Sequence, residues 1–136
     1  MNSKNAIISI LQASAFISAV LLKGLKPHDI SEQQFNVLRI LRGQKGIAAN
    51  LSTVQERMVH KMSNTTRLID KLIQKKLVKR NVCIENRRKI ELFITEDGLD
   101  FLKKIDPIID EIEKKILSNI SFKDLNSLIS ILNSIN

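Results

Sequence analysis

The chain has 136 residues, of which 43% are hydrophobic and 26% are charged, values typical of one soluble domain. With no Trp or Tyr, four Gly and two Pro, the composition argues against disorder and against an all-β sandwich, so helices should dominate. The one cysteine, Cys83, cannot form an intrachain disulfide, which fits the reducing cytoplasm that we expect as the location of the protein.

The net charge of +8 is unevenly distributed along the chain. Residues 51–90 hold eleven Lys or Arg against three Asp or Glu, an excess equal to that of the whole chain. Residues 91–136 hold five Lys or Arg against nine Asp or Glu, so this part of the chain is acidic. A concentrated basic segment suggests a surface that binds a polyanion such as nucleic acid, although a solvated charged face would have the same composition.

Residues 6–22 form the most apolar stretch, so a signal peptide or a membrane span must be considered. Polar residues interrupt this stretch every two to four positions, namely Ser9, Gln12, Ser14 and Ser18. The pattern therefore favours a helix buried both at a core and at a subunit interface, and no membrane partner is expected. Gly24 and Pro27 predict where the helix ends.

A capping box at Ser31 and Gln34 predicts the start of the second helix. The Ser hydroxyl can accept from the third helical amide, while the Gln side chain reaches back to the Ser amide. We expect this helix to bury an apolar stripe that follows helical spacing, made of Phe35, Leu38, Ile40 and Leu41.

Two further helices are predicted close together. A second box, at residues 52–55, opens a short helix that reaches about His60, and Ser63 can cap the next helix. A turn of about three residues would separate them, which is the spacing of a helix-turn-helix. The apolar positions of the later helix are Leu68, Ile69, Leu72 and Ile73.

Beyond Leu77 the period changes, because apolar residues alternate at every second position in residues 78–82 and again in 90–94. This alternation predicts a β-hairpin, and the polar residues 85–89 between its strands give it a basic tip.

Two helices are predicted to complete the chain. Thr95 should cap a long helix, in which Pro107 should produce a bend. Ser121 with Asp124 should cap a final helix whose apolar residues lie on one stripe.

The order helix, turn, helix, hairpin is that of a winged helix-turn-helix, and residues 61–98 resemble the core of MarR-type transcriptional regulators. In that family a Ser/Thr-rich recognition helix runs into Arg-Leu-x-Asp-x-Leu, followed by Leu-Val-x-Arg, an Asp-Arg-Arg wing and Leu-Thr-x-x-Gly. The matching positions here are 67–72, 77–80, 86–88 and 94–98.

Two positions depart from the family pattern. Asn86 replaces the acidic residue of the wing, so a neutral hydrogen bond, roughly half as strong, replaces an ion pair. Lys76 replaces the glycine of the turn after the recognition helix. If that position needs a positive φ, the lysine costs on the order of 1 kcal/mol.

The expected DNA contacts combine the recognition helix with the wing. The amino-terminal end of a helix in the major groove can reach base edges, where Asn pairs with adenine, Arg with guanine and the Thr methyl with thymine. Arg at the wing tip would contact the minor groove or its phosphates. The helix residues are Ser63, Asn64, Thr65, Thr66, Arg67 and Lys71, and the wing residues are Arg87, Arg88 and Lys89.

The apolar surface of the terminal helices is larger than the central module can cover, so we expect a homodimer, as the resemblance also implies. The predicted fold is mainly α (α+β): a single domain over 1–136, with a winged helix-turn-helix lobe at 31–98 and dimerisation helices at 1–26 and 99–136. A two-fold dimer reads two half-sites of double-stranded DNA, which predicts a sequence-specific regulator, specifically a repressor of a palindromic operator.

The resemblance further implies a small-molecule effector that binds between the dimer helices and the DNA-binding lobe and releases DNA. The alternative function is a winged-helix adaptor that binds another protein. We find no nucleophile–base pair, phosphate-binding glycine loop or metal-ligand cluster in the sequence, so no enzyme activity, cofactor or metal is expected.

Overall fold

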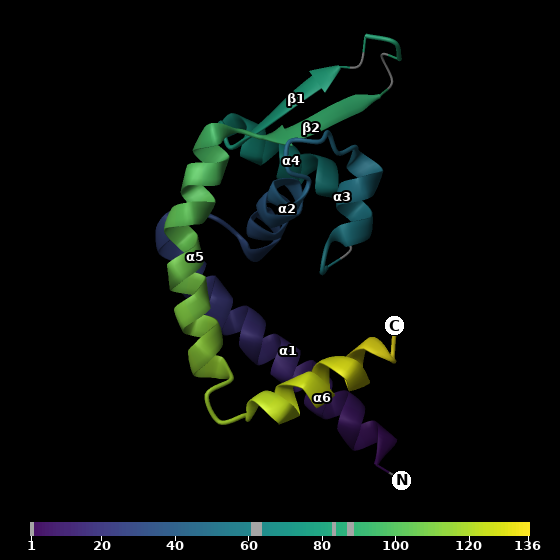
Figure 1. The fold of residues 1–136 in the computed structure, drawn as a ribbon, viewed down its shortest axis with the longest axis vertical. Coiled ribbons are helices and arrows are strands. Elements are labelled where there is room, and N and C mark those ends of the chain that lie inside the picture. Colours follow the sequence, from purple (N-terminus) through teal and green to yellow (C-terminus); the bar gives the residue numbers. More distant parts are fainter. Residues whose placement is uncertain (1, 61–63, 83, 87–88) are drawn as a thin grey trace.

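A computed structural model describes residues 2–60, 64–82, 84–86 and 89–136. The elements in chain order are α1 (Ser3–Leu25), the 3₁₀ helix η1 (Lys26–His28), α2 (Glu32–Gly43), α3 (Leu51–Arg57), α4 (Thr65–Gln74), β1 (Val78–Val82), β2 (Ile90–Ile94), α5 (Glu96–Ile116) and α6 (Phe122–Asn133). Figure 1 shows a lobe formed by α2, α3, α4 and the hairpin at one end, with α5 leading from it to α6. The mainly helical fold with a two-stranded wing is confirmed.

The predicted caps of three helices are confirmed. At the start of α2, Ser31 Oγ accepts from the Gln34 amide at 3.0 Å, and Gln34 Oε1 accepts from the Ser31 amide at 3.2 Å. Thr95 caps α5 and Ser121 caps α6, each through its hydroxyl. Pro107 lies inside α5, which continues through it along a bowed course (Figure 1).

The helix-turn-helix differs from its prediction at two points. Asn50, not Ser52, caps α3, and its side chain accepts from the amide three residues further on at 2.8 Å. Asn and Ser are comparable caps, so local sequence could not rank the two candidates. The helix also ends before the predicted His60, because Met58 is extended and packs its buried side chain into the core. In the described residues α3 ends at Arg57 and α4 begins at Thr65, which is further along the chain than the predicted three-residue turn would place it.

One hydrophobic core joins the lobe to the long helices. Phe35, Leu38 and Leu41 of α2 are buried as predicted, whereas Ile40 is half-buried at the edge of this core. The remaining buried residues include Leu25 from α1, Leu72 from α4, Leu92 from β2, and Leu102, Ile105 and Ile109 from α5. The first half of α5 is therefore part of the same packed unit as α2 and α4.

Helix α1 is held at its carboxyl end only. Of its residues, all of which are described, Leu25 alone is buried. Near that end α1 crosses α5 closely, since a Cβ placed on Gly24 would lie 2.3 Å from Ile112 Cδ1. By length and composition alone, residues 3–28 could also cross a membrane. The apolar side chains along most of α1 are therefore only partly covered within the single chain.

The carboxyl end of α4 and the amino end of α5 meet in one tight junction. Lys76 has the positive φ of 63° that the family glycine implied, and its amide donates to the carbonyl of Ile73 at 2.9 Å. The Leu77 amide donates to the Leu72 carbonyl at 3.0 Å, which completes a Schellman motif. From α5, the Thr95 hydroxyl donates to the Lys76 carbonyl at 2.8 Å, and the Thr95 amide donates to the Leu77 carbonyl at 3.0 Å.

Replacing Lys76 with glycine is expected to stabilise the protein. A left-handed conformation costs an L-residue about 1–2 kcal/mol, and part of that gain is offset because glycine gains freedom in the unfolded chain. We expect the free energy of unfolding to rise by about 0.5–1 kcal/mol in urea titrations at fixed protein concentration. Gln74→Gly, inside α4, is the matched control and should lower it by about 1 kcal/mol. A destabilised Lys76→Gly variant would contradict this prediction.

Candidate nucleic-acid interface

One face of α4 is anchored in the core and the other faces are exposed. Ile69 and Leu72 are buried, and their spacing turns the residues between them toward solvent. Thr66, Arg67 and Lys71 are exposed on the outward side of the helix. The helix therefore presents three of the predicted DNA-binding side chains on the lobe surface.

Thr65 is the exception among the predicted helix contacts. Its side chain is 0% exposed, because residue 65 precedes the buried positions 69 and 72 by four and seven residues and so shares their face. A fully buried methyl or hydroxyl cannot reach a base edge. The prediction that Thr65 contacts DNA is therefore wrong for this structure, and Thr65 belongs to the packing of α4 on the lobe.

Asn64 occupies the N-cap position of α4. It is exposed, and within the described part of the chain its side chain makes no capping hydrogen bond. An exposed side-chain amide has both the donor and the acceptor needed to pair with adenine. The predicted capping by Ser63 lies outside the described residues.

The wing is an antiparallel hairpin in which Val78 pairs with Ile94 and Val82 pairs with Ile90. Beyond the paired strands, the Lys89 amide donates to the Asn86 carbonyl at 2.8 Å, and the Lys89 residue is exposed. Arg87 and Arg88 lie outside the described residues. The wing extends away from the lobe on the side opposite the long helices (Figure 1).

An ion pair links the recognition helix to the wing. Arg80 Nη1 on β1 lies 3.7 Å from Asp70 Oδ1 on α4, and both side chains are about half exposed. Such an exposed pair contributes little to stability, about 0–1 kcal/mol, but it fixes the strand relative to the helix. Arg80 was not among the predicted site residues, although the Leu-Val-x-Arg match at 77–80 contained it.

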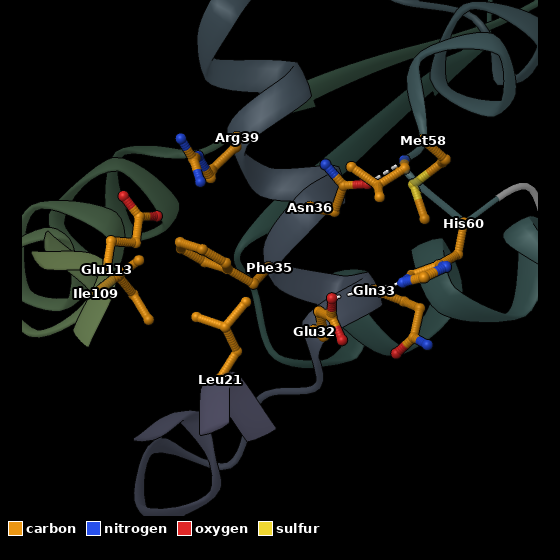
Figure 2. Close-up of a pocket in the computed structure, with 11 residues that line it drawn as sticks. Leu21, Glu32, Gln33, Phe35, Asn36, Arg39, Met58, His60, Ile109 and Glu113 are labelled. Atoms are coloured by element: carbon orange, nitrogen blue, oxygen red, sulfur yellow. Dashed lines mark hydrogen bonds and ion pairs between the residues drawn. The ribbon is translucent and has the colours of Figure 1, made fainter. Parts of the chain in front are cut away.

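A pocket lies between the lobe and the long helices, in the region where the family resemblance places an effector. Figure 2 shows the Phe35 ring between Arg39 and Leu21, with Ile109 and Glu113 of α5 beside it. The Arg39 guanidinium carbon is 5.3 Å from the centre of the Phe35 ring. The pocket thus combines an apolar, aromatic wall with a cation at its edge.

The other end of this pocket connects three elements. His60, in the segment between α3 and α4, has its Nε2 3.5 Å from Glu32 Oε1 (Figure 2). The Ser18 hydroxyl of α1 donates to the same carboxylate oxygen at 3.2 Å. The Val59 amide donates to Asn36 Oδ1 at 2.8 Å, which attaches the segment before α4 to α2.

The described residues contain no group of three or more His, Cys, Asp or Glu side chains placed to hold a metal ion. His28 lies in the 3₁₀ helix η1, before the lobe, and His60 lies in the segment between α3 and α4.

Helices α2, α3 and α4 followed by the hairpin of β1 and β2, with the outer face of α4 exposed, form the architecture of a winged helix-turn-helix. Residues 30–90 match the model of the MarR family. The chain is 30% identical over 124 residues to the HTH-type transcriptional regulator TcaR of Staphylococcus aureus (strain Newman), a match that covers 88% of this chain and 80% of TcaR. The chain belongs to the MarR family of DNA-binding transcription regulators, which are not enzymes.

Solved structures share the fold. One is Bordetella bronchiseptica BpsR, studied for regulation of its DNA binding by 6-hydroxynicotinic acid, with a TM-score of 0.87, 20% identity, and coverage of 96% of this chain and 98% of that one. Another is the organohalide-sensing regulator RdhR in its 2,4-dichlorophenol-bound form, with a TM-score of 0.89 and 16% identity. The match covers 99% of this chain and 79% of RdhR. Relatives of this fold that respond to ligands therefore exist.

Proposed function

We propose that the protein is a cytoplasmic, homodimeric repressor that binds a palindromic operator and releases it when a small ligand binds. The observation that carries the proposal is the exposed outer face of α4, with Asn64, Thr66, Arg67 and Lys71 on it. These side chains can read base edges and neutralise phosphates when the helix lies in the major groove. The excess of basic residues in 51–90 supplies long-range attraction to the duplex.

The exposed apolar side chains of α1 and α6 support a second copy of the chain as the partner. None of the residues of α6, all of them described, is buried in the single chain. The large apolar residues exposed on these helices include Ile7, Leu11, Phe16 and Leu22 on α1, and Phe122, Ile129 and Ile131 on α6. Apolar surface on two helices of one end of a soluble regulator is typical of an obligate interface.

Dimerisation would also explain how a small lobe binds tightly. A single recognition helix and wing bury too little surface for a specific complex, whereas a two-fold dimer reads two half-sites about 34 Å apart. Light scattering tests this step: we expect twice the mass of one chain. A mass equal to one chain would contradict dimer formation. So would a monomeric protein that co-sediments with liposomes.

The pocket beside Phe35 is the proposed effector site. Its aromatic wall suits a planar ring, the Arg39 guanidinium can pair with a carboxylate on that ring, and the carboxylates of Glu32 and Glu113, which also line the pocket, can accept from a ring hydroxyl. The ligands named for BpsR and RdhR are small aromatic compounds, which supports the same chemical class here. We expect 6-hydroxynicotinic acid to raise the melting temperature of the protein and to weaken its DNA binding, and Arg39→Gln to remove both effects.

The decisive experiment selects duplexes from a random-sequence library with the unmodified protein and measures their affinity by fluorescence anisotropy. An inverted repeat should be recovered. The logarithm of the association constant should fall with the logarithm of the salt concentration, with a slope of about −0.9 per phosphate contacted. Failure to select any sequence, with no salt dependence, would overturn the proposal and favour the adaptor that binds a protein.

A further inference from the structure

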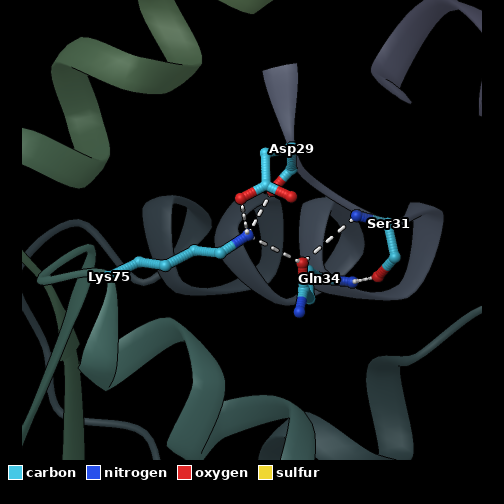
Figure 3. A network of polar contacts seen from close by, with 4 residues as sticks. All are labelled: Asp29, Ser31, Gln34 and Lys75. Atoms are coloured by element: carbon cyan, nitrogen blue, oxygen red, sulfur yellow. Dashed lines mark hydrogen bonds and ion pairs between the residues drawn. The ribbon is translucent and has the colours of Figure 1, made fainter. Parts of the chain in front are cut away.

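The side chain of Lys75 connects the recognition helix to the linker that follows α1. Lys75 is the C-cap residue of α4, and its side chain extends to the loop between η1 and α2 (Figure 3). Its Nζ donates to the carbonyl oxygen of Asp29 and, at 3.5 Å, to Gln34 Oε1. The Asp29 carboxylate lies 3.7 Å away. One ammonium thus meets three oxygens from a segment more than forty residues distant in the chain.

These oxygens are held in place before the lysine reaches them. Gln34 is only 7% exposed, and its Oε1 also accepts from the Ser31 amide in the capping box of α2. The Asp29 backbone has a left-handed φ of 54°, which sets the direction of its carbonyl. The acceptors therefore lie in the short segment from the end of η1 to the first turn of α2.

The contact contributes orientation more than stability. The Asp29 carboxylate is 98% exposed, so its attraction to Lys75 is screened by solvent. The hydrogen bonds to the Asp29 carbonyl and to Gln34 are directional and tie the last turn of α4 to a fixed point on the lobe. At the next residue, the Thr95 hydroxyl donates to the Lys76 carbonyl. The carboxyl end of α4 is thus held by both contacts.

We infer that Lys75 is a positioning residue for DNA recognition, which sets the orientation of α4 relative to the loop that joins α1 and η1 to α2, and thereby the distance between the two recognition helices of a dimer. The inference rests on the proposed function, because it requires α4 to read DNA and α1 to lie at the dimer interface. Lys75 belongs to the end of α4 away from Asn64, so its role is distinct from base contact.

The test compares Lys75→Met with the unmodified protein on the duplex that the unmodified protein selects. The methionine keeps the length of the side chain and removes its donors. We expect affinity to fall about five- to tenfold, the equivalent of roughly 1–1.4 kcal/mol. The slope of log K against log salt should not change, because no phosphate contact is lost. On duplexes with one base pair added or removed between half-sites, the variant should discriminate less than the unmodified protein.

Two matched variants separate position from charge. Lys26 and Lys75 both line one hollow on the protein surface. The Lys26→Met variant removes the other lysine of this hollow and should bind DNA with the same affinity as the unmodified protein. Lys75→Arg keeps donors at the same place and should restore most of the affinity. Melting temperatures should stay close together across the series, since the contact is exposed.

Two results would overturn the inference while the unmodified protein still binds its selected duplex. One is unchanged affinity and unchanged spacing preference in Lys75→Met. The other is a salt slope reduced in magnitude by about 1.8, or about 0.9 for each half-site, which would make Lys75 a phosphate contact. Absence of selective binding by the unmodified protein would instead overturn the proposed function, and the inference with it.

Discussion

Replacing Arg67 with alanine is expected to remove most of the sequence-specific affinity. The Arg67 side chain is exposed on the first turn of α4, and a bidentate contact between arginine and guanine is worth about 1–3 kcal/mol. A dimer loses the contact in both half-sites, so affinity for the selected duplex should fall about 30-fold to 10⁴-fold. Anisotropy titrations at one salt concentration, with the selected duplex and with a scrambled one, measure the change.

The scrambled duplex is the internal control, because loss of a base contact weakens specific binding far more than non-specific binding. Lys104→Ala on α5 removes the same charge outside the lobe and should leave both affinities close to those of the unmodified protein. Equal losses on the two duplexes for Arg67→Ala would show that the guanidinium contacts only the phosphate backbone.

Replacing Leu38 with alanine is expected to cause the largest loss of stability. Leu38 is fully buried in α2, where the core residues of α1, α4 and α5 meet. Truncation removes buried methyl groups and leaves a cavity, which costs about 2–5 kcal/mol. The free energy of unfolding from urea titrations should fall by this amount, at matched protein concentration because a dimer is stabilised by mass action.

Leu38→Ile conserves volume and should cost less than about 1.5 kcal/mol. Ile47→Ala truncates a side chain that is mostly exposed and should change stability by no more than about 0.5 kcal/mol. A Leu38→Ala variant as stable as either of these would mean that the α2 core is not the main source of stability.

Features encoded locally could be predicted from the sequence. The capping box at Ser31 depends on residues within one turn, and the alternation in residues 78–82 and 90–94 predicts a hairpin that the structure confirms. The positive φ at Lys76 was anticipated only through the family resemblance, because nothing in the local sequence around a lysine demands it.

Two kinds of feature could not be predicted: the choice between equally good capping residues, and contacts between segments that are far apart in the sequence. Asn50 and Ser52 are both adequate caps, and the packing of Met58 into the core decides where α3 ends. The burial of Thr65, by contrast, follows from its helical spacing to Ile69 and Leu72, which is visible in the sequence. The contact of Lys75 with Asp29 joins segments whose proximity exists only in the folded chain.

The junction at residues 76–77 gives α5 a mechanical role. Thr95, the N-cap of α5, is hydrogen-bonded to the residue that follows the C-cap of α4. A Cβ on Gly98 would lie 2.4 Å from the Leu77 carbonyl oxygen, so the start of α5 is in close contact with the end of α4. With 21 residues, α5 is about 32 Å long and can act as a lever. A tilt of about 5° displaces its far end by roughly 3 Å, close to the rise of one base-pair step of about 3.4 Å. Under the proposed function, an effector bound beside Ile109 that tilts α5 by this amount would shift the recognition helix by about one base-pair step relative to its groove.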